Sequence, residues 1–410
     1  MDKLTPTVVV TGRGAVTPLG SDFQGSWRRL VGGEDAQAPV TIFDVSGCRC
    51  KQAAEARLPD LSGVEWRKRR RWSRATRLIV PALREALDGA GLLDAHGRSR
   101  QARLPLSIST TGGAMAMGEA FLRNLLGPRR RPERLFNVGR YQAHQQVLDL
   151  HDHFGFRGPV MIVANACASG ANAIGHGADL IRAGLAEIVV TGGYEPLTEL
   201  IYVGFDCLQA MSTDRCRPFD KARSGLMLGE AAAFLVLESD QHARARGADI
   251  LGTVAGYGHG TDAHHLTQPN PRGAVLVNVM RRALAQANCA ASDIGYLNAH
   301  GTATPLNDAS ECAAFAELLG EKLGSVRISS TKAAMGHSLG AAGTIEALFA
   351  LEALRTGELP PNLNVREPEP AVAGNLVAVG ERATAMRATM SVNLGFGGSN
   401  AALVFTRYEA

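Results

Sequence analysis

The sequence predicts a layered α/β fold in which two similar halves pack as one body. Short β-branched runs alternate with alanine-rich segments of helical periodicity, which is the βαβ rhythm of this class. The chain has 410 residues, 45% hydrophobic and 20% charged, enough to bury a large core. A weak repeat, Val8–Gly14 against Gly252–Gly258, opens two stretches of similar content. We therefore expect an N-terminal half over residues 1–250 and a C-terminal half over residues 251–410.

The expected strands are short runs of β-branched and other apolar residues. In chain order they are Val8–Thr11, Leu106–Thr110, Val160–Ala164, Ile188–Thr191, Ala233–Glu238, Ile294–Ala299, Val326–Ser330 and Ala401–Phe405. The expected helices are Arg77–Ala90, Ala168–Ala183, Gly273–Ala287, Asp308–Leu319 and Ala341–Arg355. Two irregular stretches that contain Arg and Pro, Gly32–Arg71 and Met115–Phe156, look like insertions in the first half that cap the fold.

The composition excludes several classes of protein. No apolar run approaches the roughly 18 residues of a membrane span, and the chain opens into a strand-like run without a leader pattern. Seven cysteines, an odd number in a long chain without a secretion signal, predict reduced thiols rather than a disulfide framework. We expect a cytoplasmic protein.

Possible metal ligands cluster in three places, at Cys48 and Cys50, at His151–His153, and at His264 and His265. The cysteine pair has no second Cys or His pair at zinc-ligand spacing, so an ordinary loop is favoured over a metal site. The histidine clusters read as surface or structural residues. We predict no metal site.

The net charge of +4 is small but unevenly distributed. The basic run Arg67–Arg71 lies between Trp66 and Trp72, and Arg129–Arg131 follows later. Such runs are usually solvated faces, and the alternative is a surface for an acidic macromolecule. Nucleic acid is a remote partner because no nucleic-acid fold signature accompanies the charge.

Four distant segments set reactive side chains among small residues, at positions 166–170, 298–305, 330–337 and 393–400. Cys167 follows a predicted strand and begins a predicted helix, where unpaired amides and the macrodipole lower a thiol pKa from about 8.5. The position therefore suits a nucleophile. For a lone cysteine, the alternative is a small buried hydrophobe.

His300 and His337 each follow a predicted strand. Two imidazoles can donate hydrogen bonds to one developing enolate oxygen, each worth about 2.7–4 kcal/mol. Lys332 lies in an apolar segment and can hold the pair in the right protonation state. Phe396, among three glycines, can act as a door. Structural histidines, a surface lysine and a tight turn are the alternatives, but the combination favours a thioester-condensing active site.

In these segments, and in Pro218–Arg223 and Gly229–Glu230, the chain resembles the β-ketoacyl-[acyl-carrier-protein] synthases of type II fatty-acid and polyketide synthesis, within the thiolase superfamily. The resemblance covers nearly the whole chain. It implies a five-layered αβαβα thiolase fold and a homodimer, or a heterodimer with a related subunit. It also implies no cofactor of the chain's own, since phosphopantetheine arrives on the acyl carrier protein.

The resemblance further implies the reaction. Cys167 takes an acyl group from its carrier, malonyl-carrier loses carbon dioxide with the help of His300 and His337, and 3-oxoacyl-carrier is released. Lys332 matches a lysine that supports the histidine pair. The backbone N–H groups of Cys167 and Phe396 match an oxyanion hole.

Other matched positions concern substrate and carrier. Thr302 and Thr304 match threonines that bind the phosphopantetheine arm, and Phe396 matches a gate of the acyl pocket. Three basic residues match the position where relatives dock the acidic carrier: Arg67, Arg70 and Arg71.

Departures from the family pattern at Asn165, Gly229–Ala233 and Leu394 leave two pathways open, fatty-acid elongation and specialised polyketide or polyene synthesis. A catalytically silent chain-length partner is the alternative function, although such partners typically lack the reactive cysteine. A degradative thiolase needs a second cysteine near the C-terminus, and no cysteine follows Cys312.

Overall fold

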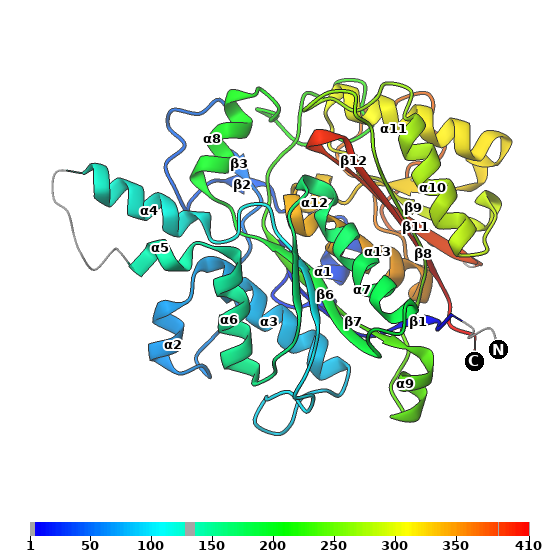
Figure 1. The fold of residues 1–410 in the computed structure, drawn as a ribbon. Coiled ribbons are helices and arrows are strands. Elements are labelled where there is room, and N and C mark those ends of the chain that lie inside the picture. The colour runs from blue at the N-terminus through cyan, green and yellow to red at the C-terminus, as the bar shows by residue number, and fades with distance from the viewer. Residues whose placement is uncertain (1–4, 128–135, 384, 410) are drawn as a thin grey trace.

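The computed structural model describes residues 5–127, 136–383 and 385–409 (Figure 1). Its main sheet has ten strands in the order β10-β9-β11-β12-β8-β1-β7-β6-β4-β5. The strands of the N-terminal half are β1 (Val8–Val16), β4 (Leu106–Ser109), β5 (Val160–Val163), β6 (Ile188–Glu195) and β7 (Ala231–Ser239). Those of the C-terminal half are β8 (Gly252–Thr261), β9 (Ile294–Asn298), β10 (Arg327–Ser329), β11 (Ala388–Gly395) and β12 (Ser399–Thr406). A separate pair consists of β2 (Ala38–Pro39) and β3 (Gln52–Ala53).

The two halves of the sheet repeat one pairing pattern. In the first half β4 pairs in parallel with β5 and β6, and β6, β7 and β1 continue antiparallel. In the second half β9 pairs in parallel with β10 and β11, and β11, β12 and β8 continue antiparallel. β1 and β8, which carry the sequence repeat, occupy equivalent positions and join the halves. We propose that the chain divides between β7 and β8, near residue 250.

Helices form three layers around the two halves of the sheet. α7 (Ser169–Arg182) packs on β4 and β6, α13 (Ala342–Thr356) packs on β9 and β11, and the two helices pack on each other (Figure 1). α3 (Arg74–Gly89) covers the outer face of the first half, and α10 (Ala274–Gln286), with α11 (Pro305–Leu319) beside it, covers that of the second. The expected αβαβα order is confirmed.

Strands inside the main sheet, such as β6 and β7, bury both faces because helices lie on each side of them, whereas the edge strand β5 is partly exposed. On β7, Leu235 and Leu237 point into the central core with α7 and α13, whereas Phe234 and Val236 point into the outer core under α3. α13 is buried from Ala342 to Leu354, as a middle-layer helix must be.

The remaining helices are α1 (Phe23–Val31), α2 (Trp66–Arg71), α4 (Met115–Leu126), α5 (Phe136–Arg140), α6 (Ala143–Phe154), α8 (Glu199–Cys207), α9 (Asp240–Ala245) and α12 (Lys332–Met335). The short 3-10 turns are η2 (Ala166–Ala168), η3 (Ala291–Asp293), η4 (Gly320–Ser325), η5 (Leu339–Ala341) and η6 (Phe396–Gly398). The expectation of irregular structure over residues 115–156 is wrong, because α4, α5 and α6 occupy most of the described part of this segment. Figure 1 shows α4 and α5 projecting from the N-terminal half.

All eight expected strands and all five expected helices are present, with ends shifted by a few residues. β8 and β11 were not expected as strands. β8 is rich in glycine because α10 lies directly against it: a Cβ at Gly256 would be 1.9 Å from the Ala283 carbonyl oxygen, and one at Gly258 would be 2.1 Å from that of Val279. The close packing that requires glycine also removes the β-branched signal.

Two expectations from composition can be compared with the described residues. All seven cysteines are free, as predicted for reduced thiols. Within the described ranges, no helix is both long and apolar enough to cross a membrane.

Candidate active site

Cys167 lies on the turn between β5 and α7, where the sequence places a nucleophile. Ala166 adopts a positive φ of 59°, which is uncommon for a residue with a side chain. The Ser169 hydroxyl donates to the Ala166 carbonyl at 2.5 Å and accepts from the Asn165 N–H at 2.8 Å. These bonds fix the sharp turn, and they leave Cys167 6% exposed.

The expected lowering of the Cys167 pKa is wrong. Burial raises the pKa of this thiol to about 12, against opposing contributions from the Lys332 ammonium and the Phe396 N–H. The charges of Glu195 and Glu346 add to the rise. A helix macrodipole is worth at most about 2 kcal/mol, or roughly 1.5 pKa units, so burial outweighs it. The thiol is protonated in the resting site.

The side chains of His300 and His337 lie close to the Cys167 thiol. The two imidazoles are T-shaped, with centroids 5.2 Å apart, and one atom of each lies within 4.8 Å of the other and of the Cys167 sulfur. Burial lowers the pKa of both imidazoles well below 6.5, and the Lys332 ammonium lowers it further. Both imidazoles are therefore neutral.

Hydrogen bonding orients the His337 imidazole. The Leu339 N–H donates to His337 Nδ1 at 3.3 Å, so the ring proton lies on Nε2. Neither Nε2 of His337 nor Nδ1 of His300 has a hydrogen-bond partner among the described residues. A neutral ring with a free N–H is suited to donate to a substrate oxygen.

Lys332 is buried behind the histidine pair. Its Nζ donates to the His300 carbonyl at 2.6 Å and forms an ion pair with Glu346 of α13. Glu346 also accepts from Asn393 Nδ2 at 2.6 Å. The surface alternative for Lys332 is thus wrong. Glu346 was not among the predicted site residues, although buried acids in the otherwise apolar helix α13 are a usable signal.

A second buried acid holds the backbone of the His300 loop. Glu311 of α11 accepts from the N–H groups of His300 and Gly301, each at 2.7 Å, and from Asn307 Nδ2 at 2.8 Å. Burial raises the pKa of Glu311 to about 8. Its carboxyl binds the main chain of His300 and leaves the imidazole free.

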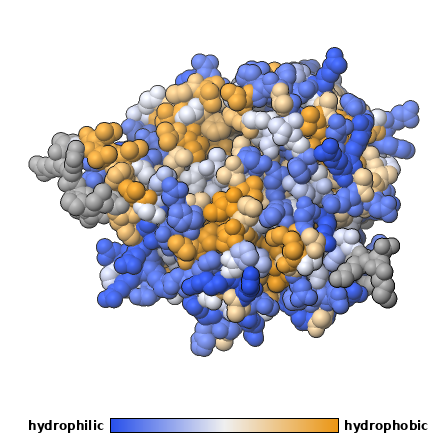
Figure 2. Space-filling view, viewed as in Figure 1, coloured by the Kyte–Doolittle hydropathy of each residue, from blue (hydrophilic) through white to orange (hydrophobic). Residues whose placement is uncertain are grey.

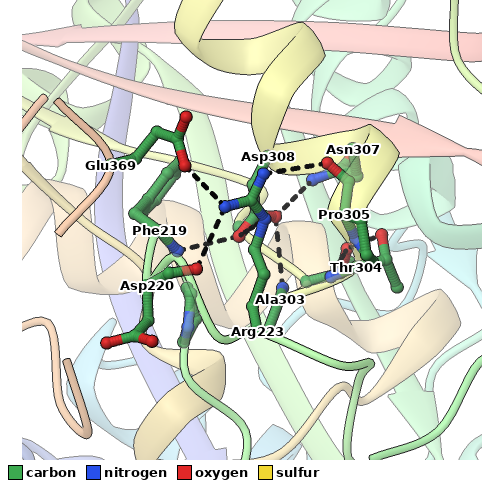
Figure 3. A network of polar contacts seen from close by, with 12 residues as sticks. Phe219, Asp220, Arg223, Ala303, Thr304, Pro305, Asn307, Asp308 and Glu369 are labelled. Atoms are coloured by element: carbon green, nitrogen blue, oxygen red, sulfur yellow. Dashed lines mark hydrogen bonds and ion pairs between the residues drawn. The ribbon is translucent and has the colours of Figure 1, made fainter. Parts of the chain in front are cut away.

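A polar network braces the next residues of this loop (Figure 3). Asp308 accepts from the N–H groups of Phe219, at 2.8 Å, and Ala303, at 3.1 Å. Arg223 approaches Asp308 at 3.8 Å and donates to the Pro305 carbonyl at 3.0 Å. The family-like segment Pro218–Arg223 therefore holds the loop that carries Thr302 and Thr304.

The reactive groups open into one cavity of about 350 Å³, a volume within the range of small-molecule sites. The hydroxyls of Thr302 and Thr304 lie 2.8 Å apart. The exposed side chains of Leu208, Leu266 and Leu306 line its outer part. The predicted site residues that line the cavity are Cys167, His300, His337, Thr302, Thr304 and Phe396.

Phe396 stands at the cavity, 37% exposed. Its ring stacks on Phe205 of α8, with centroids 5.7 Å apart, and its backbone N–H is directed at Cys167. The next residue, Gly397, has a φ of 81° and donates its N–H to the Leu266 carbonyl at 2.7 Å. The glycine conformation turns the chain sharply directly after the ring.

The basic residues predicted to dock a carrier do not line the cavity. Arg67, Arg70 and Arg71 are exposed on α2, and the first two stack over the ring of Trp66 at 5.9 and 5.2 Å. The second basic run, 129–131, lies outside the described residues. The structure places these arginines on an outer surface without showing a partner.

Comparisons with known proteins agree with this geometry. The β-ketoacyl synthase N-terminal domain model matches residues 5–243, and the corresponding C-terminal domain model matches residues 251–366. The 3-oxoacyl-[acyl-carrier-protein] synthase 2 proteins of Staphylococcus aureus (strain N315) and Rhizobium meliloti (strain 1021) are 34% and 37% identical to this chain, and each alignment covers 98% of it and 99% of the relative.

Among solved structures, the ishigamide ketosynthase/chain length factor superposes with a TM-score of 0.88 at 31% identity, covering 99% of this chain and 100% of that one. The likeness extends over the whole fold as well as the sequence. The chain therefore belongs to the β-ketoacyl synthase family of thiolase-fold acyltransferases.

Proposed function

We propose that the chain catalyses a decarboxylative Claisen condensation between an acyl group held on Cys167 and malonyl-[acyl-carrier protein]. The observation that supports this most is the meeting of one thiol and two neutral imidazoles, within 4.8 Å of one another, in a single cavity. Nucleophile and hydrogen-bond donors are the two kinds of group that the reaction needs.

In the first half-reaction, the Cys167 sulfur attacks the carbonyl carbon of the acyl-carrier thioester. The carbon–sulfur bond to the carrier breaks, and the proton of the Cys167 thiol passes to the departing pantetheine thiolate. The backbone N–H groups of Cys167 and Phe396 stabilise the oxyanion of the tetrahedral intermediate. Because the resting thiol is protonated, this proton has to leave the sulfur as the new carbon–sulfur bond forms.

In the second half-reaction, the malonyl carbon–carbon bond breaks and carbon dioxide leaves. The electron pair forms an enolate, whose oxygen accepts from Nε2–H of His337 and from His300. The enolate carbon attacks the acyl carbon on Cys167, the carbon–sulfur bond to the cysteine breaks, and the departing thiolate takes a proton from solvent. Lys332 supports this step in two ways, since it anchors the His300 carbonyl and disfavours imidazolium in both rings.

The carrier-borne phosphopantetheine enters through the cavity mouth. Thr302 and Thr304 offer hydroxyl groups to its amides, and Phe396 gates the acyl pocket by rotating away from Phe205. We propose that the acidic carrier docks on the exposed arginines of α2, Arg67, Arg70 and Arg71, as the positive charge of that helix favours.

A dimer is the proposed assembly. β5 is an edge strand of the main sheet, and its Val160 and Met161 are exposed. Figure 2 shows apolar side chains gathered over α4 and in the middle of the same face. An apolar unpaired edge is a natural place for another chain to add. The partner is a second copy or a related subunit, as in the ketosynthase/chain length factor neighbour.

The reaction is tested with purified chain, acyl-carrier primer and malonyl-carrier. Release of carbon dioxide with formation of 3-oxoacyl-carrier supports the proposal, and Cys167→Ala must remove both acylation and product. A chain that only binds a catalytic partner, the alternative function, would leave product formation unchanged in Cys167→Ala when that partner is present. Fatty-acid elongation and polyketide or polyene synthesis are separated by which primers acylate Cys167.

A further inference from the structure

Glu195, the last residue of β6, is a buried acid that the proposed reaction does not use. It is 1% exposed, and its carboxylate accepts from the backbone N–H groups of Thr111 at 2.6 Å, Gly112 at 2.7 Å and Gly340 at 3.0 Å. No Lys, Arg or His within the described ranges forms an ion pair with it. Its donors are backbone N–H groups and the Thr110 hydroxyl, which donates to it at 3.3 Å, and burial raises its pKa to about 7.

The three backbone donors come from both halves of the fold. Thr111 and Gly112 follow β4 in the first half, whereas Gly340 lies in η5 of the second half, three residues after His337. The Ser109 hydroxyl donates to the Gly340 carbonyl at 2.8 Å, so this residue is held at both its N–H and its carbonyl. The fit is tight, since a Cβ at Gly340 would lie 2.6 Å from the Thr111 nitrogen.

The segment around Gly340 determines the orientation of the His337 imidazole. Leu339, whose N–H fixes the proton of His337 on Nε2, has a positive φ of 42°. Such a conformation costs free energy in a leucine and persists only where the surroundings impose it. Gly340 is the next residue, so the bonds from Glu195 and Ser109 act one residue from the strained position.

We propose that Glu195 is a positioning residue, whose carboxylate holds Gly340 against the turn at Thr111 and Gly112 and thereby fixes the His337 imidazole relative to Cys167. It touches no substrate. The inference rests on the proposed function for its catalytic consequence, whereas the clamp on Gly340 can be tested without the reaction.

The test compares Glu195→Gln with a matched control, Glu85→Gln. The amide of Gln turns one acceptor oxygen into an NH₂ donor, which leaves a backbone N–H without an acceptor. Glu85 of α3 is a partly buried acid that accepts from the N–H groups of Ala15 at 2.9 Å and Phe23 at 3.0 Å, away from the cavity. Its replacement makes the same chemical change.

In Glu195→Gln, we expect acylation of Cys167 within about 3-fold of wild type and malonyl-carrier decarboxylation slower by about 10-fold to 100-fold, the loss that a displacement near 1 Å causes. Glu85→Gln should lower the unfolding midpoint without separating the two rates. Ser109→Ala removes the hydrogen bond to the Gly340 carbonyl and should also slow decarboxylation more than acylation, but by a smaller factor than Glu195→Gln. Equal loss of both rates in Glu195→Gln, or the same separation in Glu85→Gln, overturns the inference.

Amide hydrogen exchange gives a readout independent of activity. In Glu195→Gln the amides of Thr111, Gly112 and Gly340 should exchange faster than in wild type, whereas in Glu85→Gln they should not. Unchanged exchange at Gly340 refutes the clamp whatever the reaction is. If wild type neither decarboxylates malonyl-carrier nor becomes acylated, the proposed function fails, and faster exchange at Gly340 still supports the clamp.

Discussion

The protonation state of Cys167 can be measured from the pH dependence of its alkylation. Iodoacetamide reacts with thiolate rather than thiol. Burial raises the pKa to about 12 from 9.0, and the start of α7 can return at most roughly 1.5 units of that rise. The net pKa is therefore above that of an exposed cysteine.

The magnitude follows from the thiolate fraction. At pH 7 an ordinary thiol with a pKa of about 8.5 is roughly 3% thiolate, whereas a pKa between about 10.5 and 12 gives a thiolate fraction of about 3 × 10⁻⁴ to 10⁻⁵. The alkylation rate of Cys167 should thus be at least about 100-fold below that of an exposed thiol at pH 7. It should rise about tenfold per pH unit through pH 9.

The assay is peptide mass spectrometry of samples alkylated between pH 6 and pH 10, with the exposed Cys207 of the same chain as internal reference. The sign is fixed by the raised pKa, because thiolate accumulates only as the pH approaches it. A Cys167 rate that levels off with a midpoint at or below pH 8.5 would refute the reasoning. It would mean that the helix N-terminus and Lys332 outweigh burial.

Three further predictions concern the roles of other groups. His300→Ala and His337→Ala should still be acylated, as intact mass will show, but should each decarboxylate malonyl-carrier about 10²-fold to 10³-fold more slowly, and loss of acylation as well would reject the separation of roles. Reversing the charge of Arg67, Arg70 and Arg71 to Glu should raise KM for the carrier-bound substrate far more than for a pantetheine thioester, with Arg244→Glu on α9 as control; equal effects on both substrates would exclude docking there. Glu346→Gln leaves the Lys332 ammonium buried without its carboxylate and should lower the free energy of unfolding by about 3–5 kcal/mol in urea titrations, and a loss below about 1 kcal/mol would show that the pair contributes little.

Much of the fold was accessible from sequence because its strands are buried on both faces. The run Ala233–Leu237 of β7, for example, is apolar throughout and fully buried, and therefore stands out. β8 could not be recognised as a strand, because α10 packs so closely on Gly256 and Gly258 that side chains are excluded there. α4 and α5 were missed because neither has a buried residue, so both lack the stripe that marks a core helix. α6 has such a stripe, at Val147, Leu150 and Phe154, and could have been predicted.

For the active site, prediction from sequence was limited in a different way. Cys167, His300, His337 and Lys332 carry reactive side chains in small-residue segments and could be found one at a time. Glu195 could not, because its role consists of contacts with the backbone of Thr111, Gly112 and Gly340, far away in sequence. The environment of Cys167 was also misjudged, since a turn can be predicted from its local sequence whereas burial depends on everything that packs around it.

The placement of the buried acids explains how this site keeps its histidines neutral. A carboxylate bonded to an imidazole favours imidazolium, the arrangement used where histidine must accept and hold a proton. Here Glu311 binds the His300 main chain, Glu346 binds Lys332, and Glu195 binds Gly340. Within the described residues no carboxylate bonds to either ring, and His337 Nδ1 receives a backbone N–H instead. Each acid thus adds rigidity around the rings without charging them, so two neutral donors remain available for an enolate oxygen.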